Sequence, residues 1–204
     1  MKNIKNLVLL QFENLFALKK YTALAVGLAI FIAYAMPHML PYAGGILIMG
    51  TCYNSAFYEE KGKINYLIHS LPVKSSEYIL SKYIFVAINT LISMIILSIL
   101  AGIKQLGGAN ITPMWILILI LGAIGILTMT ILIPLQILLD TQKARFILSF
   151  LIAFTVIYSI TLAEILPTIN FNNGTFKLLI VLCILTLILV SYFITSNLYA
   201  KKNI

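Results

Sequence analysis

Long hydrophobic stretches alternate with short polar ones along the chain. A helix crosses the hydrocarbon core of a bilayer, roughly 30 Å thick, with about 20 apolar residues. Six stretches are suited to crossing it, and none shows the alternation of polar and apolar positions that marks a barrel strand. They are residues 21–37, 42–58, 83–103, 113–139, 146–165 and 177–198. The pattern predicts an all-α integral membrane protein with six transmembrane helices in one domain, residues 1–204.

The fourth predicted span is long and the second is short. Pro134 lies inside the fourth span. Because proline has no N–H to complete the helical hydrogen-bond pattern, it is expected to kink the helix there.

Residues 1–20 form a loosely amphipathic segment before the first span. One face of a helical wheel is apolar, and it carries Ile4, Leu7, Val8, Leu15 and Leu18. The opposite face carries Lys2, Lys5, Asn6, Glu13 and Lys20 and is interrupted by Leu9 and Phe16. The pattern predicts an N-terminal amphipathic helix on the inner membrane surface. It also fits a longer, tilted first helix.

Charge and composition agree with a membrane protein. The chain is 61% hydrophobic and has a mean hydropathy of +1.04, well beyond the values of a soluble domain. Of its 14 Lys and Arg residues, all but Lys104 and Lys177 fall on one side of the predicted spans. Basic loops stay in the cytoplasm, so both termini are predicted to be cytoplasmic in the cell membrane. The net charge of +8 then needs no nucleic acid as a partner.

A charged segment, which we call the elbow, joins the second and third spans at residues 59–82. Its seven charges would cost about 20 kcal/mol at membrane depth, so it is expected in the cytoplasm. Pro72 should end a short helix, and Ser75 or Ser76 should cap the next one, with Glu77 in its first turn. The first helix is predicted by hydrophobic residues at i, i+3, i+4 and i+7, which are Ile64, Leu67, Ile68 and Leu71.

Three short motifs in the elbow carry a family resemblance. They are Glu59-Glu60-Lys61-Gly62, Ser70-Leu71-Pro72-Val73-Lys74 and Ile79-Leu80-Ser81-Lys82-Tyr83. With the six-span layout, they make the chain similar to compact ABC-2 permeases, the transmembrane subunits of ABC exporters. One departure is that the family often has an arginine just after the "LPV-S" turn. This chain has Lys74 followed by two serines, so a bidentate arginine contact is not expected.

The resemblance implies that the elbow is a coupling helix that contacts a separate ATP-binding subunit. The contact residues it implies are Glu59, Glu60, Lys61, Ile64, Leu67, Ile68, Leu71, Pro72 and Lys74. ATP and magnesium would bind to that partner, and this chain would bind no cofactor. It would work as a dimer with a second copy or a paralogous permease.

The sequence lacks the motifs of an ATPase or a protease. No G-x-x-x-x-G-K-[ST] occurs, and no H-E-x-x-H. The Glu59-Glu60 pair resembles the E-E-x-x-x-R of membrane-embedded CAAX-type proteases, but Ile64 takes the place of the arginine. Cys52 and Cys183 are interpreted as buried small hydrophobic residues. The chain is therefore not predicted to be an enzyme.

Few polar side chains interrupt the spans. Tyr53, Asn54, Asn89 and Gln136 are candidates for a transport path, or for hydrogen bonds between helices. A path of this mild polarity would suit an amphipathic or antimicrobial peptide, a lipid or a drug-like molecule. Glu164, near the outer end of the fifth span, fits an outer gate or a helix-end carboxylate that reaches water.

Two other classes of protein remain open. A substrate-capture subunit of an energy-coupling-factor uptake system would share the small size and the A-x-x-x-A face formed by Ala25, Ala29 and Ala33. Such spacing is a general packing device, and the charged elbow argues against this class. A non-transporting immunity or accessory membrane subunit would share the same bundle.

Overall fold

Every regular element in the described part of the chain is a helix. The computed structural model describes residues 2–36, 39–62, 73–108, 113–139, 146–147, 150–151, 153–154 and 174–201. Its elements are α1 (Lys2–Ala17), α2 (Lys19–Ala35), α3 (Leu40–Gly45), the π-helix η2 (Ile46–Gly50), α4 (Thr51–Lys61), α6 (Ser75–Leu106), α7 (Met114–Leu127), the π-helix η3 (Thr128–Leu132), α8 (Ile133–Leu138) and α10 (Gly174–Lys201). The predicted all-α class is therefore confirmed for these residues.

Three helical stretches among the described residues are long and apolar enough to cross a membrane. They are Ser75–Leu106, Met114–Ile137 and Val181–Lys201, and they fall on the predicted third, fourth and sixth spans. A fourth is added if the bent pair α1–α2 counts as one span. The continuous stretch α3–η2–α4 falls on the predicted second span. The predicted fifth span lies mostly outside the described residues, so six spans remain a prediction.

The N-terminal segment forms a helix of its own. The axes of α1 and α2 differ by 83°, and the chain turns at Leu18. The hydroxyl of Thr22 donates a hydrogen bond across the turn to the carbonyl of Leu15, at 2.8 Å. Helix α1 packs against α4 and α6, so Leu7 and Leu15 are buried, as their face of the helix predicts.

The kink expected at Pro134 stays a prediction, and the π-helix η3 ends two residues before this proline. Proline cannot donate to the carbonyl four residues earlier, which belongs to Thr130. That carbonyl accepts a hydrogen bond from the hydroxyl of Ser191 on α10, at 3.3 Å. Ser191 and the Tyr83 hydroxyl of α6 are also 2.8 Å apart. The freed carbonyl thus helps to hold α10 against the bundle.

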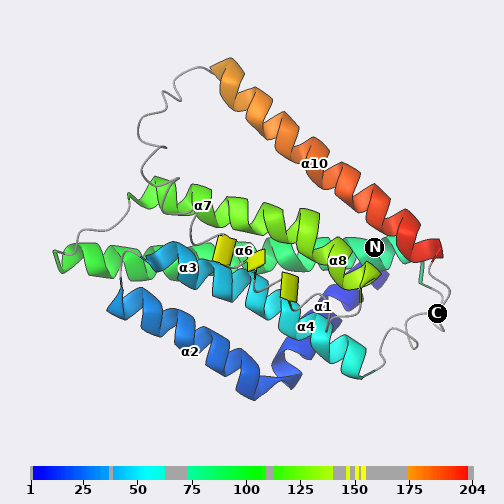
Figure 1. The fold of residues 1–204 in the computed structure, drawn as a ribbon, viewed down its shortest axis with the longest axis horizontal. Coiled ribbons are helices and arrows are strands. Elements are labelled where there is room, and N and C mark those ends of the chain that lie inside the picture. Colours follow the sequence, from blue (N-terminus) through cyan, green and yellow to red (C-terminus); the bar gives the residue numbers. More distant parts are fainter. Residues whose placement is uncertain are drawn as a thin grey trace.

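Helix α6 lies at the centre of the fold and contacts α1, α7 and α10 (Figure 1). Its 32 residues span about 48 Å, more than the hydrocarbon core of a bilayer. Small residues let its neighbours approach closely. Gly125 of α7 lies against Thr90, and Gly44 of α3 lies against Leu97 and Leu121. Any side chain at these two glycines would overlap with buried atoms.

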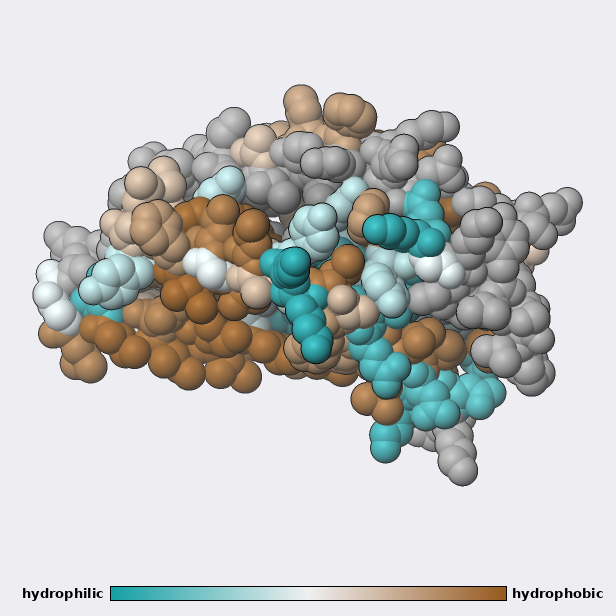
Figure 2. Space-filling view, turned by 90° about the horizontal axis from the view of Figure 1, so that it is seen from below, coloured by the Kyte–Doolittle hydropathy of each residue, from teal (hydrophilic) through white to brown (hydrophobic). Residues whose placement is uncertain are grey.

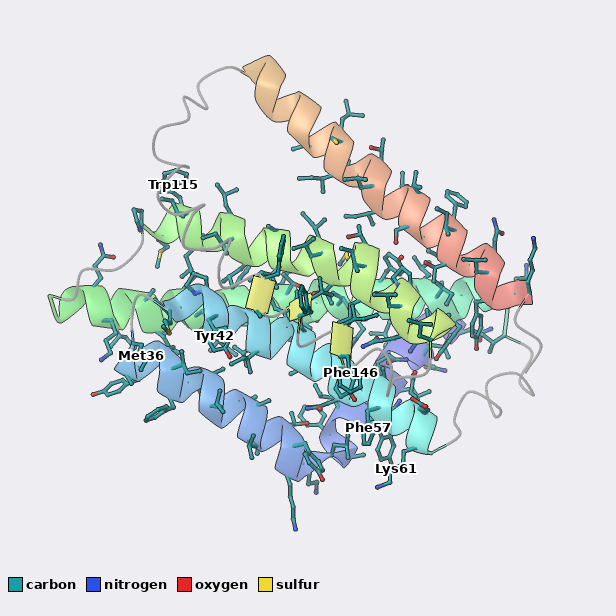
Figure 3. The ribbon with its side chains drawn as sticks, in the orientation of Figure 1. Met36, Tyr42, Phe57, Lys61, Trp115 and Phe146 are labelled. Atoms are coloured by element: carbon teal, nitrogen blue, oxygen red, sulfur yellow. The ribbon has the colours of Figure 1, made fainter. Side chains whose placement is uncertain are left out.

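The two ends of the bundle differ in character. The end of α4, the start of α6 and the end of α10 share one end, where Lys61 lies in Figure 3. Trp115 and Met36 lie at the opposite end, where Lys104 places its ammonium over the ring of Tyr34 at 3.5 Å. Figure 2 shows hydrophobic side chains over the left and centre of one face, and hydrophilic ones gathered toward the Lys61 end.

Candidate functional site

The candidate site is a buried ion pair that joins the two ends of the elbow. Glu59 is in the last turn of α4 and Lys82 in the second turn of α6. The Lys82 Nζ lies 2.5 Å from Glu59 Oε2, and the glutamate side chain is only 2% exposed. Charges this deep must be compensated by direct partners, because water cannot solvate them.

Both oxygens of the Glu59 carboxylate accept further hydrogen bonds. Tyr78 donates its hydroxyl to Oε2 at 2.9 Å, and Gln11 of α1 donates Nε2 to Oε1 at 2.5 Å. The Gln11 side-chain oxygen accepts in turn from the Ser55 hydroxyl, at 2.9 Å. We call these five residues the elbow base. It connects α1, α4 and α6 through one carboxylate.

The C-terminal part of helix α10 packs against the elbow base. The ring of Tyr199, in the last turns of α10, lies 5.2 Å from that of Tyr78, and both residues are buried. The Lys82 ammonium is also 5.0 Å from the Tyr78 ring, within the range of a cation–π contact. Four helices therefore meet where the elbow leaves the bundle and returns to it.

The elbow residues differ in their surroundings. Glu60 is half-buried, while Lys61 and Lys74 are exposed. Helix α6 begins at Ser75 with Glu77 in its first turn, as predicted. The predicted serine cap is wrong, because Lys74 occupies the N-cap position and no side chain caps the helix. The remaining predicted contacts, Ile64, Leu67, Ile68, Leu71 and Pro72, lie outside the described residues.

The residues predicted as candidates for a transport path also differ in their surroundings. Tyr53 and Asn54 are half-buried on α4, and the Tyr53 ring stacks on Phe57 with their centroids 6.1 Å apart. Asn89 is buried and donates from Nδ2 to the Thr51 hydroxyl at 2.6 Å and to the Ile48 carbonyl at 3.3 Å. Ile48 belongs to the π-helix η2, and its carbonyl also accepts a hydrogen bond from the backbone N–H of Thr51.

Gln136 lies next to the elbow base. Together with Gln11 and Lys82, it lines a cavity of about 10 Å³, and its Nε2 has no hydrogen-bond partner among the described residues. A space of that size cannot hold a cargo molecule. Glu164, the other candidate near the membrane, lies outside the described residues. Of the two cysteines, Cys52 is buried as predicted, whereas Cys183 is exposed, so its predicted burial is wrong.

Replacing Asn89 with alanine should destabilise the bundle moderately. The change removes two hydrogen bonds between α6 and the η2–α4 stretch, and such bonds contribute about 0.6 to 1.7 kcal/mol inside membrane proteins. Thermal unfolding in detergent would measure the loss, with the exposed Asn6→Ala as the matched control. An unchanged melting temperature together with altered transport would instead favour a role for Asn89 in the path.

Comparison with known proteins identifies the family. A family model described as ABC-2 family transporter protein matches residues 5–200, which is nearly the whole chain. The chain therefore belongs to the ABC-2 family of transporter proteins, and the predicted family is confirmed. Comparisons with curated proteins and with solved structures gave no match. Membership makes the chain a membrane transport component that is not itself catalytic, in a family that works with ABC ATP-binding subunits.

Proposed function

We propose that this chain is the permease subunit of an ATP-driven exporter that works with a separate ATP-binding subunit. The observation that carries the proposal is the family match over residues 5–200. The permease would have six spans, both termini in the cytoplasm, and an elbow that contacts the ATP-binding subunit. This placement is supported by the lysines Lys61, Lys74 and Lys201, which come from helix ends at the same end of the bundle.

The elbow base supports a coupling role for residues 59–82. A loop transmits motion only if its ends are firmly held, and here the ion pair between Glu59 and Lys82 ties α4 to α6. When the ATP-binding subunits close on ATP, they would displace the elbow and move both helices together. Glu59 itself faces inward, so Glu60, Lys61 and Lys74 are the described residues that offer side chains to a partner.

The proposed exporter is a dimer, formed with a second copy or a paralogous permease. Two bundles tilting against each other would open a path between them. Its proposed cargo is an amphipathic or antimicrobial peptide, a lipid or a drug-like molecule. The half-buried Tyr53 and Asn54 on α4 support this choice, since they offer mild polarity and no charge.

Introducing two aspartates into the elbow should separate the permease from its ATP-binding subunit. Leu67→Asp/Leu71→Asp places charges on the apolar face of the predicted coupling helix, and we expect at least about a tenfold loss of bound subunit. The measurement is affinity purification from native membranes in mild detergent, followed by an ATPase assay. Leu106→Asp is the matched control, because Leu106 is 92% exposed at the other end of α6.

The result has clear alternatives. If no ATP-binding subunit accompanies the wild-type protein, the exporter proposal fails. If the subunit remains bound to the double variant, the elbow does not contact it. Transport of a labelled cargo by the reconstituted complex then separates a true permease from an immunity or accessory subunit.

A further inference from the structure

An apolar groove of about 570 Å³ runs along the surface between α1 and α6. Helix α1 lines it with Lys5, Leu9 and Phe12, and α6 lines it with Leu80, Ile84 and Ile88. The three residues on each helix are spaced three or four apart, so each set forms one continuous stripe. Apart from the ammonium of Lys5, these six side chains are hydrocarbon.

The groove accounts for an irregularity in the α1 sequence. Leu9 interrupts the polar face of the helical wheel and remains 50% exposed in the structure. It lies on the same stripe as Phe12, whose ring meets the buried ring of Phe85 edge to face at 4.9 Å. That contact fixes α1 against α6, so the groove is formed before anything enters it.

The groove continues onto the side of α6 whose exposed apolar side chains can contact lipid. Beyond Ile88, the same side of the helix presents Leu91, Ile95 and Ile99, each about 60% exposed. These side chains lie within a stretch long and apolar enough to cross a membrane. A hydrocarbon chain could therefore pass from the bilayer into the groove without leaving an apolar surface.

The positive charge of Lys5 indicates which kind of molecule the groove binds. Its side chain is exposed at the groove and has no acidic partner among the residues that the structure describes. A second copy of the chain fits less well, because a two-fold contact centred here would bring two Lys5 ammoniums together. A phospholipid, in which one glycerol carries both a phosphate and acyl chains, matches both the charge and the apolar walls.

We propose that the groove binds an anionic phospholipid of the leaflet in which α1 lies. One acyl chain lies against Leu9, Ile84 and Ile88, and the headgroup phosphate pairs with Lys5. The bound lipid fills the junction between α1 and α6, next to the elbow base. This role is separate from the ATP-binding partner and does not depend on it.

Native mass spectrometry of the full chain in detergent tests this inference. The probes are phosphatidylglycerol and phosphatidylcholine with identical acyl chains. The wild-type protein should retain phosphatidylglycerol preferentially, and Lys5→Gln should reduce that preference about fivefold. Lys19→Gln, which removes an exposed lysine outside the groove, should leave it unchanged.

A second pair of variants tests the acyl-chain half of the site. Leu9→Trp places a large ring in the groove and should lower retention of both lipids, whereas Phe16→Trp should not. Both positions are exposed on α1, so neither change disturbs the core. Equal retention of the two lipids, or a preference that survives Lys5→Gln, would overturn the proposal. Protein dimers that form in place of lipid adducts and vanish in Leu9→Trp would assign the groove to a second copy.

Discussion

Replacing Glu59 with alanine should lower the free energy of unfolding by about 3–5 kcal/mol, the largest single-residue effect that we expect in this chain. The substitution removes the anionic partner of the Lys82 ammonium, whose side chain is only 10% exposed and is therefore poorly solvated by water. It also leaves the donors of Gln11 and Tyr78 without their shared acceptor. Reversible unfolding in mixed detergent micelles would measure the loss, with the exposed Glu13→Ala as the control.

A double-mutant cycle separates the ion pair from the packing around it. Lys82→Ala alone leaves the carboxylate of Glu59 buried without its cation, so it should also be strongly destabilising. The double variant should be less damaging than the sum of the two single changes, since no lone charge remains. Additive effects would show that the two charges do not stabilise each other, and that the elbow base depends on packing alone.

Substituting Gly44 with valine should have the largest effect expected outside the elbow base. A Cβ at this position would lie 2.0 Å from Cδ2 of Leu121 and 3.3 Å from Cδ1 of Leu97. Both leucines are fully buried, so neither can move aside without displacing α6 or α7. Forcing extra atoms into such a core costs about 1–3 kcal/mol, or prevents folding. The yield of folded protein in detergent and its melting temperature would measure the effect.

Two further variants make this result specific. Gly27→Val adds the same atoms on α2, where nothing lies within 4 Å, and should be tolerated. Leu121→Ala introduced together with Gly44→Val should recover part of the loss, because it vacates the space that the new methyl groups need. If Gly44→Val is as stable as Gly27→Val, then α3 and α7 are less closely packed than the structure indicates.

The long hydrophobic stretches in the sequence were enough to locate the long helices. The predicted third span, residues 83–103, falls within α6, and the predicted fourth span corresponds to α7, η3 and α8. Helix α6 begins eight residues before the predicted span, because a helix does not end where the apolar region ends. Position 83 is where charged residues stop, whereas the backbone is already helical from Ser75. Hydropathy therefore locates membrane depth better than helix boundaries.

The elbow base was harder to predict, since it depends on which helices are neighbours. Glu59 and Lys82 were recognised as charged and were placed in the cytoplasm with the other elbow charges. A local signal did exist: Cys52, Ser55 and Glu59 recur at intervals of three and four on α4, and all three are buried. Nothing in the sequence indicates, however, that α1 brings Gln11 to this stripe. The pairing depends on the turn at Leu18 and on tertiary packing.

The π-helices were also only partly predictable. Pro134 led to the prediction of a kink, because its missing N–H can be read from the sequence, and η3 lies directly before it, but a π-helix was not predicted. No proline lies within η2, and the hydrogen bond from Asn89 to the Ile48 carbonyl was expected only as an unspecified contact between helices. A local change of helical hydrogen bonding does not require proline, so the composition of residues 46–50 did not indicate η2.

In the elbow, the residues that fix its direction are different from the residues that would bind a partner. Residues that fix the direction in which the elbow leaves the bundle are buried at positions 59 and 82, whereas residues that would recognise a partner lie between them. Under the proposed coupling role, exchanging the intervening segment between related permeases would change which ATP-binding subunit is recruited and leave the bundle intact. Partner choice could diverge after gene duplication without a new fold, as long as the glutamate and the lysine were kept.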